Sequence, residues 1–508
     1  MKKIIISILF LFSLIGCNTI EKKETRPNII YILADDLGYG ELDVYGQEKI
    51  LTPNIDKLAR SGMMFMQHYS GSPVCAPSRS VLLTGKHAGH TYIRGNDEWK
   101  ERGEVWDYAK ASADPNLEGQ RPILKGTITI GSLLQKAGYK TGIFGKWGLG
   151  APLSEGRPNL QGFDYFYGYN CQRQAHNLYP PHLWENDMKI ILNNELIVPN
   201  TKLDKGADPY DEKSYSRFQQ NDYAPEKIHQ KALTFIKQNK DQPFFIYYAS
   251  PLPHLPLQIP REYLDNYRKL FGEEQPYIGD KGYFPNRYPR AAYASIISYL
   301  DQQVGELVAT LKELGLYKNT LIIFSSDNGP TYIGGVDFDF FNSAKPFKNG
   351  YGRSKGFVYE GGIRIPMITS WPNHIKAGST TDHISAFYDL LPTICDITGI
   401  ETPKDIDGIS FKPTLLNQSQ QKHDHLYWEF PSYKGQQAVR MNKWKGIRKN
   451  IFEKNMNIEL YDLGKDIREE NNVADQYPEV IKKIKRIMDE EHETSTIKRF
   501  QFNQLGDK

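Results

Sequence analysis

The chain has 508 residues, and its 63 Lys and Arg residues nearly balance its 60 Asp and Glu residues, giving a formal net charge of +3. This balance excludes a nucleic-acid-binding protein that depends on a large basic excess. Hydrophobic residues make up 39% and charged residues 24%, as in globular rather than disordered proteins. The 4 cysteines are too few for a disulfide framework, and whether Cys171 and Cys395 pair is left open.

The first segment has the features of a bacterial lipoprotein signal peptide. A basic start precedes an apolar run, Ile4 to Ile15, that is too short for a permanent membrane span. The sequence Leu-Ile-Gly-Cys17 that closes it resembles a lipobox; the alternative is an ordinary signal peptide followed by a chance cysteine. We expect a signal peptide over 1–16 and a polar tether over 17–26. Acyl chains such as palmitate on Cys17 would anchor the exported protein to the outer membrane, on its periplasmic or cell-surface face.

Four short apolar runs predict strands that are buried on both faces. They are Asn28 to Ala34, Lys140 to Phe144, Pro243 to Ala249 and Thr320 to Phe324. Helical patterns lie between them, at 52–62, 127–137, 225–238 and 291–314. This alternation predicts an α/β fold with a mixed, mainly parallel sheet between two layers of helices. Polar residues follow each run, so we expect them to meet at the carboxyl edge of the sheet.

The pattern changes after about residue 400. Short strands with tight turns are predicted at 426–430, 437–441, 444–447 and 459–463, followed by an amphipathic helix at 477–492. We therefore expect a catalytic domain over 27–400 and a smaller α+β subdomain over 401–508, built from an antiparallel sheet and one helix.

The stretch from Ser72 to Gly85 carries the most specific motif. It reads Ser-Pro-Val-Cys75-Ala-Pro-Ser-Arg79 and continues as an apolar helix that ends in Thr-Gly. This motif resembles the signature of the formylglycine-dependent (type I) sulfatases of the alkaline-phosphatase superfamily, and the resemblance extends over most of residues 26–480. It implies an alkaline-phosphatase-like fold and a similarity to bacterial polysaccharide sulfatases.

The resemblance makes Cys75 the precursor of the nucleophile. In that family a formylglycine-generating enzyme or an anaerobic sulfatase-maturing enzyme oxidises the cysteine to formylglycine (3-oxoalanine), whose hydrate attacks sulfur. A helix starting near Pro77 would place Cys75 just before its first turn, where free amide groups favour a developing anion. By itself, a buried thiol at a helix end would be the ordinary interpretation.

Two acidic pairs predict a metal site. Asp35-Asp36 and Asp327-Asn328 follow two of the predicted strands and offer the hard oxygen donors that Ca²⁺ prefers. The resemblance assigns these four residues to the metal site of the family, with oxygens of residue 75 and of the sulfate completing the shell. Taken singly, each pair would be an ordinary turn.

Cationic residues and one histidine complete the expected catalytic set. By resemblance, Arg79 contacts the nucleophile and the metal carboxylates, while Lys146 and Lys355 bind the sulfate group. Fixed positive charges in such a pocket stabilise the charge that builds on the transferring sulfuryl group. His254, in a Pro-rich segment after the third strand, matches the histidine that protonates the leaving alcohol.

The chain departs from the family pattern at one position. The commonest pattern reads Gly-Lys-Trp-His-Leu-Gly, and Gly148 stands here where that histidine helps eliminate sulfate. Our hypothesis is that His176 supplies an imidazole in its place, with a substrate contact or plain packing as the alternatives. Further residues expected to support or line the pocket are Ser72, His87, His90, Arg94, Asn96 and the aromatic segment from Tyr179 to Trp184.

The leading functional prediction is an exported sulfatase that acts on a sulfated carbohydrate such as ulvan, carrageenan or a glycosaminoglycan. A phosphodiesterase or phosphonate hydrolase of the same superfamily is the first alternative, although the chain lacks the histidine pair of a larger metal shell. A catalytically inactive sugar-binding lipoprotein is the second. It predicts loss of the charged site residues, yet all nine are present: Asp35, Asp36, Cys75, Arg79, Lys146, His254, Asp327, Asn328 and Lys355.

Overall fold

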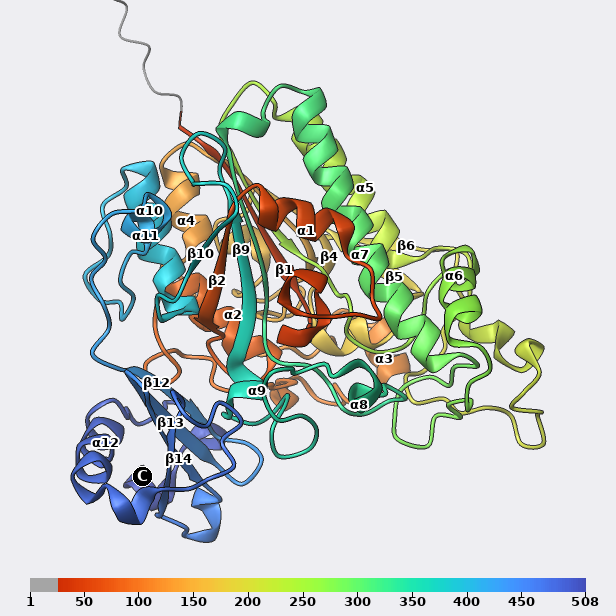
Figure 1. Ribbon diagram of the computed structural model, residues 1–508. Coiled ribbons are helices and arrows are strands. Elements are labelled where there is room, and N and C mark those ends of the chain that lie inside the picture. Colours follow the sequence, from red (N-terminus) through yellow and green to blue (C-terminus); the bar gives the residue numbers. More distant parts are fainter. Residues whose placement is uncertain (1–25) are drawn as a thin grey trace, which may run out of the picture.

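The computed structural model describes residues 26–508. The predicted signal peptide 1–16, the lipidation site Cys17 and nearly all of the tether 17–26 lie outside the described residues. Within the described part of the chain, no helix combines the length and the apolar character that a membrane span requires. Figure 1 shows a large sheet flanked by helices, with a smaller sheet formed by the C-terminal residues below it.

The large sheet has 11 strands and is mixed but mainly parallel. At its centre β1 (Asn28–Ala34) pairs in parallel with β7 (Phe244–Ala249) and β8 (Thr320–Ser326). The strand order is β10-β2-β9-β8-β1-β7-β3-β4-β5-β6, and β11 also pairs with β2. The remaining strands are β2 (Met63–Tyr69), β3 (Lys140–Lys146), β4 (Tyr165–Tyr169), β5 (His182–Glu185), β6 (Met188–Ile191), β9 (Arg364–Ser370), β10 (Ser379–Thr381) and β11 (Ser385–Ala386).

Helices cover both faces of this sheet. Alternate residues of β1 belong to different cores: Ile30 and Ile32 pack with α1, α5 and α7, whereas Ile29 and Leu33 pack with α2, α4 and α10. Figure 1 shows α4 and α10 on one side and α5 and α7 on the other. The helices are α1 (Pro53–Arg60), α2 (Cys75–Thr84), α3 (Tyr108–Ala113), α4 (Ile130–Lys136), α5 (Ala224–Gln238), α6 (Arg261–Phe271), α7 (Pro289–Glu313), α8 (Phe338–Phe341), α9 (Glu360–Ile363), α10 (Leu390–Thr398), α11 (Lys412–Leu415) and α12 (Pro478–Glu490).

Two predicted helix starts are corrected. Helix α2 begins at Cys75 itself rather than near Pro77, because a proline is tolerated in a first turn whose amide groups have no partner within the helix. Helix α4 begins at Ile130 rather than Thr127. Thr129 caps it: the Thr129 hydroxyl accepts from the Ser132 amide at 3.0 Å, and Ser132 reciprocates at 2.9 Å.

The C-terminal segment forms the predicted antiparallel sheet with one helix. Its strands, in spatial order, are β12 (Leu426–Phe430), β13 (Gln436–Met441), β14 (Trp444–Lys449) and β15 (Ile458–Asp462). Helix α12 packs Ile484 and Met488 against Val439 and Leu460 of this sheet. The predicted α/β class with a smaller C-terminal α+β subdomain is therefore confirmed.

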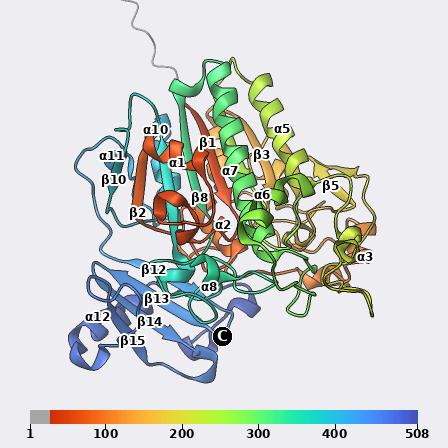
Figure 2. The ribbon, with the colours of Figure 1, turned by 45° about the vertical axis from the view of Figure 1, so that its right-hand side comes forward.

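Buried ion pairs hold the small sheet against the large one. Glu360, at the start of α9, accepts from Lys445 of β14 at 2.8 Å and from Arg364 of β9 at 3.1 Å. Burial alone would raise the pKa of Glu360, but Lys445, Arg440 and Arg364 lower it to about 2. Figure 2 shows the small sheet beneath the end of the large one, where β1 and β8 terminate. The C-terminal residues can therefore contribute to a site at that end.

Candidate active site

Polar side chains at or just beyond the carboxyl ends of four central strands lie close together at one edge of the sheet. Asp35 and Asp36 follow β1, Lys146 ends β3, and Asp327 follows β8. His254 lies five residues beyond the end of β7. All of these side chains are buried. The arrangement is the one expected for ligands of an α/β sheet, which bind beyond the carboxyl ends of the strands.

Cys75 is the first residue of α2 and is only 1% exposed. Its thiol lies 3.4 Å from the Asp35 carboxylate, as a donor to Oδ1. The next amide, that of Ala76, donates to Asn96 Oδ1 at 3.1 Å. Burial raises the pKa of Cys75 far above its usual range, and the charge of Asp35 raises it further. Cys75 is therefore a neutral thiol, unlike the reactive cysteines that act as thiolates.

Three cationic side chains pair with the three carboxyl groups around this thiol. Lys146 Nζ lies 2.6 Å from Asp35 Oδ2, and Lys355 Nζ lies 2.6 Å from Asp36 Oδ2. Arg79 donates to Asp327 Oδ2 from Nε at 3.1 Å and from Nη2 at 2.9 Å. Nη2 of Arg79 also lies 3.3 Å from Asp35, and its Nη1 donates to the carbonyl of Lys146. Each cation thus occupies one carboxylate oxygen and fixes the direction of the other.

These three cations do not suffice to keep all three carboxyl groups ionised. Burial raises the pKa of Asp327 to about 7, and repulsion from Asp35 adds to this shift. Burial also raises the pKa of Asp36, against the opposing effect of Lys355. Of the three, only Asp35 has a lowered pKa, because the positive charges of Lys146 and Arg79 outweigh the effect of its burial. A further positive charge would allow all three carboxylates to ionise, as in a cation site.

The residues present fit such a cation. Asn328 Oδ1 is buried without a hydrogen-bond partner among the described residues, while Nδ2 donates to Asp36 Oδ1 at 2.7 Å. Rotation of this amide by half a turn would direct its oxygen at the carboxylates. Ligand atoms of Asp35, Asp36, Cys75 and His254 lie within 4.8 Å of one another. Carboxylate and amide oxygens suit a hard divalent cation.

A cavity of about 540 Å³ opens beside Cys75. The His254 ring donates from Nδ1 to the carbonyl of Leu255 at 2.7 Å, which leaves Nε2 directed at the site, 3.6 Å from Asp36 Oδ2. The His176 ring stacks on the His254 ring, with centroids 5.2 Å apart and planes at 16°. Burial lowers the pKa of both histidines well below the usual range, so both are neutral in this state.

Gln172 occupies the space over Gly148. A Cβ built on Gly148 would lie 3.1 Å from Gln172 Cγ, and the glycine has a φ of +77°. Gln172 Nε2 donates to Asn96 Oδ1 at 3.1 Å, so the same asparagine oxygen links Gln172 to the first turn of α2. A histidine side chain at position 148 would displace this link.

Several residues expected at the pocket lie elsewhere. Tyr179 and Trp184 are buried in the hydrophobic cores, so they have no face free to stack on a sugar. His87 and His90 pair with Glu491 at 2.9 Å and Asp407 at 2.9 Å, away from the cavity wall. Arg94 forms an ion pair with Glu429, and the buried Ser72 hydroxyl has no hydrogen-bond partner within residues 26–508. Cys171 and Cys395 are free thiols and do not pair with each other.

The sequence missed most of the cavity wall. Glu98 and Trp106 come from irregular segments, Arg173 comes from the 3-10 helix Gln172–His176, and Tyr283 comes from the segment between α6 and α7. Phe430 is the last residue of β12, and Ser432 and Tyr433 lie in the turn between β12 and β13 of the small sheet. The high aromatic content, 12%, was the only signal of this wall.

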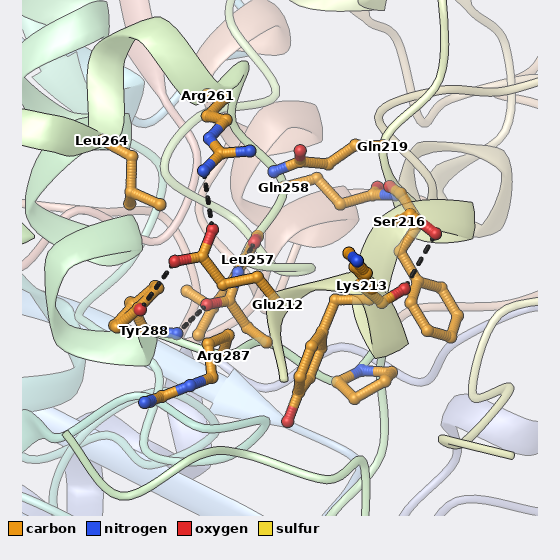
Figure 3. Close-up of a pocket in the computed structure, with 14 residues that line it drawn as sticks. Glu212, Lys213, Ser216, Gln219, Leu257, Gln258, Arg261, Leu264, Arg287 and Tyr288 are labelled. Atoms are coloured by element: carbon orange, nitrogen blue, oxygen red, sulfur yellow. Dashed lines mark hydrogen bonds and ion pairs between the residues drawn. The ribbon is translucent and has the colours of Figure 1, made fainter. Parts of the chain in front are cut away.

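A second cavity, of about 190 Å³, lies between the segments around α6 and carries no comparable chemistry. Figure 3 shows that the carboxylate of Glu212, which lines this cavity, is already paired with Arg261 and Tyr288. Glu212 accepts from Arg261 at 2.8 Å and from the Tyr288 hydroxyl at 2.8 Å. The cavity beside Cys75 is therefore the candidate active site.

Comparison with known proteins identifies the family. The family model described as Sulfatase matches residues 27–400. The chain belongs to the sulfatase family. A second model, described as N-sulphoglucosamine sulphohydrolase, C-terminal, matches residues 351–494. The sulfatase is similar to N-acetylgalactosamine-6-sulfatase of Mus musculus, with 28% identity over 93% of this chain and 87% of that protein. Arylsulfatase A of Homo sapiens is 29% identical over 91% of this chain and 87% of that protein.

A bacterial relative and solved structures agree with this family. N-acetylgalactosamine-6-O-sulfatase of Bacteroides thetaiotaomicron is 27% identical over 94% of the sulfatase and 96% of that protein. The crystal structure of Ps i-CgsB in complex with k-i-k-neocarrahexaose matches with a TM-score of 0.70 and 26% identity, over 92% and 94% of the two chains. The fold is thus the alkaline-phosphatase-like fold, and the sulfatase is a sulfuric ester hydrolase.

We expect Gly148→Ala to lower kcat/KM of the sulfatase as well as its stability. The left-handed backbone at φ +77° costs about 1–2 kcal/mol once a Cβ is present. The same Cβ must push Gln172 and weaken its bond to Asn96. Gly126→Ala is the matched control, because Gly126 has φ +81° with nothing within 4 Å of its built Cβ. Denaturant unfolding and steady-state kinetics check this, and equal activity in the two variants would contradict it.

Proposed function

We propose that this sulfatase hydrolyses sulfate esters of carbohydrates, with residue 75 acting as formylglycine beside a bound Ca²⁺. The single observation that carries the proposal is the position of Cys75, buried in the first turn of α2 and surrounded by three carboxylates and three cations. A thiol with so high a pKa is a poor nucleophile, so the charged site around it calls for a different group at position 75.

The carbohydrate substrate is supported by relatives and by the cavity. The N-acetylgalactosamine 6-sulfatases and the structure with bound neocarrahexaose are named for sulfated sugars. The cavity of about 540 Å³ has polar and aromatic walls, as sugar-binding sites have. Ulvan, carrageenan and glycosaminoglycans, or oligosaccharides derived from them, are the substrates we propose to test.

Two groups complete the proposed site. Oxidised to formylglycine by a formylglycine-generating or anaerobic sulfatase-maturing enzyme, residue 75 supplies a hydrated aldehyde that attacks the sulfur. Asp35, Asp36, Asp327 and Asn328 would hold Ca²⁺, which orients and polarises the sulfate. Export and a lipid anchor at Cys17 belong to the same proposal, since a surface location would bring the enzyme to polymeric substrates.

The cations of the chain bind the sulfate and stabilise its developing charge. Lys146 and Lys355 already lie beside the carboxylates, so both ammonium groups can reach the oxygens of a sulfate placed near residue 75. Arg79, fully buried, fixes Asp327 and Asp35 and thus holds the metal ligands in place. Preorganised charges in a dry site avoid the cost of reorganisation during the reaction.

His254 is positioned to protonate the leaving alcohol. Its Nδ1–H is held by the carbonyl of Leu255, so a second proton on Nε2 would point into the site. Burial and Lys355 lower the pKa of His254 before substrate binds, and the negative charge of a sulfate ester opposes this effect. A sugar hydroxyl leaves poorly as an alkoxide, which makes a general acid necessary.

His176 is the proposed second imidazole. It stacks on His254 and lines the same cavity, whereas Gln172 fills the space of the missing histidine at Gly148. We propose that it accepts a proton in the step that follows departure of the alcohol and restores the free enzyme.

Two alternatives remain distinguishable. The phosphonate monoester hydrolase of Agrobacterium radiobacter matches with a TM-score of 0.60 at 18% identity, a likeness of fold alone. Phosphonate and phosphodiester substrates therefore belong in the activity tests. An inactive sugar-binding protein would not require the ion pairs of Lys146, Arg79 and Lys355 with their carboxylates, because the cost of removing such charges from water can exceed what their pairing returns.

The substrate proposal predicts a leaving-group effect for His254→Ala. We expect kcat/KM to fall by about 10²–10⁴ for the sugar sulfate that is turned over fastest in a panel of sulfated saccharides, because its alkoxide needs a proton. The fall should be much smaller for 4-nitrophenyl sulfate, whose phenolate leaves unaided. Equal losses on the two substrates would contradict the acid role. A wild-type enzyme that cleaves the aryl ester but no sugar sulfate would contradict the substrate proposal.

For His176→Ala, we expect a burst of released alcohol followed by a slower steady state, because the step after alcohol departure loses its base. Rapid-quench kinetics with a sugar sulfate measures the burst amplitude, which should approach one per active site. Wild-type turnover without a burst would refute the proposed role of His176.

Calcium binding predicts a stability change that does not depend on activity. At a Ca²⁺ concentration of about 100 times Kd, the EDTA-dialysed protein should gain about 2.7 kcal/mol of stability. Thermal unfolding measures this gain. Asp327→Asn serves as the comparison, since it removes one proposed ligand charge and should abolish the gain. An identical melting temperature with and without Ca²⁺ in the wild type would contradict a calcium site.

A further inference from the structure

The active-site cavity is lined by polar and aromatic residues that have no role in the proposed binding of the sulfate group. The cavity lined by Cys75, Lys355 and His254 is also lined by Glu98 and Trp106, which come from the segment between α2 and α3. A volume of about 540 Å³ exceeds what a sulfate group fills. The remaining space must hold the alcohol part of the ester.

Glu98 has an unusual environment for a carboxyl group. Within residues 26–508 its side chain makes no hydrogen bond and no ion pair, although it is partly buried and lines the cavity. The neighbouring Asp97, by contrast, pairs with Arg121 and Arg499. A carboxyl group that lines a cavity without a partner from the protein is free to form hydrogen bonds with a ligand.

The charge state of Glu98 suits an anionic substrate. Burial raises its pKa to about 8, with Asp97 adding to the shift and Arg173, Lys146 and Arg499 opposing it. A carboxyl group that is mostly protonated at neutral pH does not repel a sulfate ester. It can also donate one hydrogen bond and accept another, which matches the hydroxyl groups of a sugar.

Trp106 offers an apolar surface beside this carboxyl group. Its side chain is 60% exposed, yet it is held in place, because the Arg173 guanidinium lies 5.0 Å from its ring centroid. Arg173 is itself fixed by donation from Nη1 to the carbonyl of Val105 at 3.1 Å. A rigid exposed indole at the wall of a cavity suits the C–H face of a pyranose ring.

We propose that Glu98 and Trp106 form the subsite that recognises the sugar ring, with Glu98 hydrogen-bonding to ring hydroxyls and Trp106 packing on the ring face. This inference rests on the proposed function. It assigns the choice of alcohol to residues that do not touch the sulfate, so the subsite affects sugar esters and not simple aryl esters.

The test compares two substrates in the matured enzyme: 4-nitrophenyl sulfate and the sugar sulfate that the wild type turns over fastest. We expect Glu98→Ala to lower kcat/KM for the sugar sulfate by about 10- to 100-fold, the loss typical of a buried hydrogen-bonding partner. Activity on 4-nitrophenyl sulfate should stay at the wild-type level. Glu98→Gln, which keeps a donor and an acceptor, should retain most of the sugar activity.

Trp106→Ala should show the same selective loss, mainly as a higher KM. Glu104→Ala is the matched control, because Glu104 belongs to the same segment, is exposed and does not line the cavity. Equal losses on both substrates in Glu98→Ala, or no loss on either, would overturn the subsite while leaving the sulfatase activity intact. A wild type that cleaves the aryl ester but no sugar sulfate would overturn the proposed function itself, and the subsite with it.

Discussion

The Asp35 carboxylate is the contact on which the rest of the site depends. One of its oxygens faces the Cys75 thiol at 3.4 Å, and the other lies 2.6 Å from Lys146 and 3.3 Å from Arg79. It thereby joins the end of β1 to the start of α2 and to the end of β3. Strand β7 pairs in parallel with both β1 and β3, which places the carboxyl ends of these strands at the same edge of the sheet. Moving any one of them would leave a buried charge unpaired.

The balance of positive and negative charge in the buried site explains why it would bind both a divalent cation and a sulfate group. The buried carboxylates favour a cation, as the raised pKa of Asp327, about 7, indicates. The buried ammonium groups of Lys146 and Lys355 favour an anion. A site that holds a dication and a sulfate group side by side satisfies both. The cavity is also lined by Glu98 and Trp106, where, in our proposal, hydrogen bonding and ring packing decide which alcohol is accepted.

Most of the central site could be predicted from the sequence, because its residues directly follow apolar strands or occupy one continuous motif. That Asp35 and Asp327 lie close together follows from their positions directly after β1 and β8, because parallel strands have their carboxyl ends at the same edge of a sheet. The cavity wall was not predictable: Glu98, Tyr283 and Tyr433 lie in irregular segments far apart in the chain. The aromatic segment from Tyr179 to Trp184 was wrongly expected at the pocket, since composition alone does not distinguish a core ring from an exposed one.

The chemical state of residue 75 tests the central claim most directly. Mass spectrometry of the tryptic peptide from Ser61 to Arg79, taken from protein purified out of its native host, reads this state without any substrate. The account predicts an aldehyde, seen as a peptide lighter than the cysteine form and reactive toward a hydrazide. An unmodified thiol, in a host that matures its other sulfatases, would contradict catalysis through residue 75.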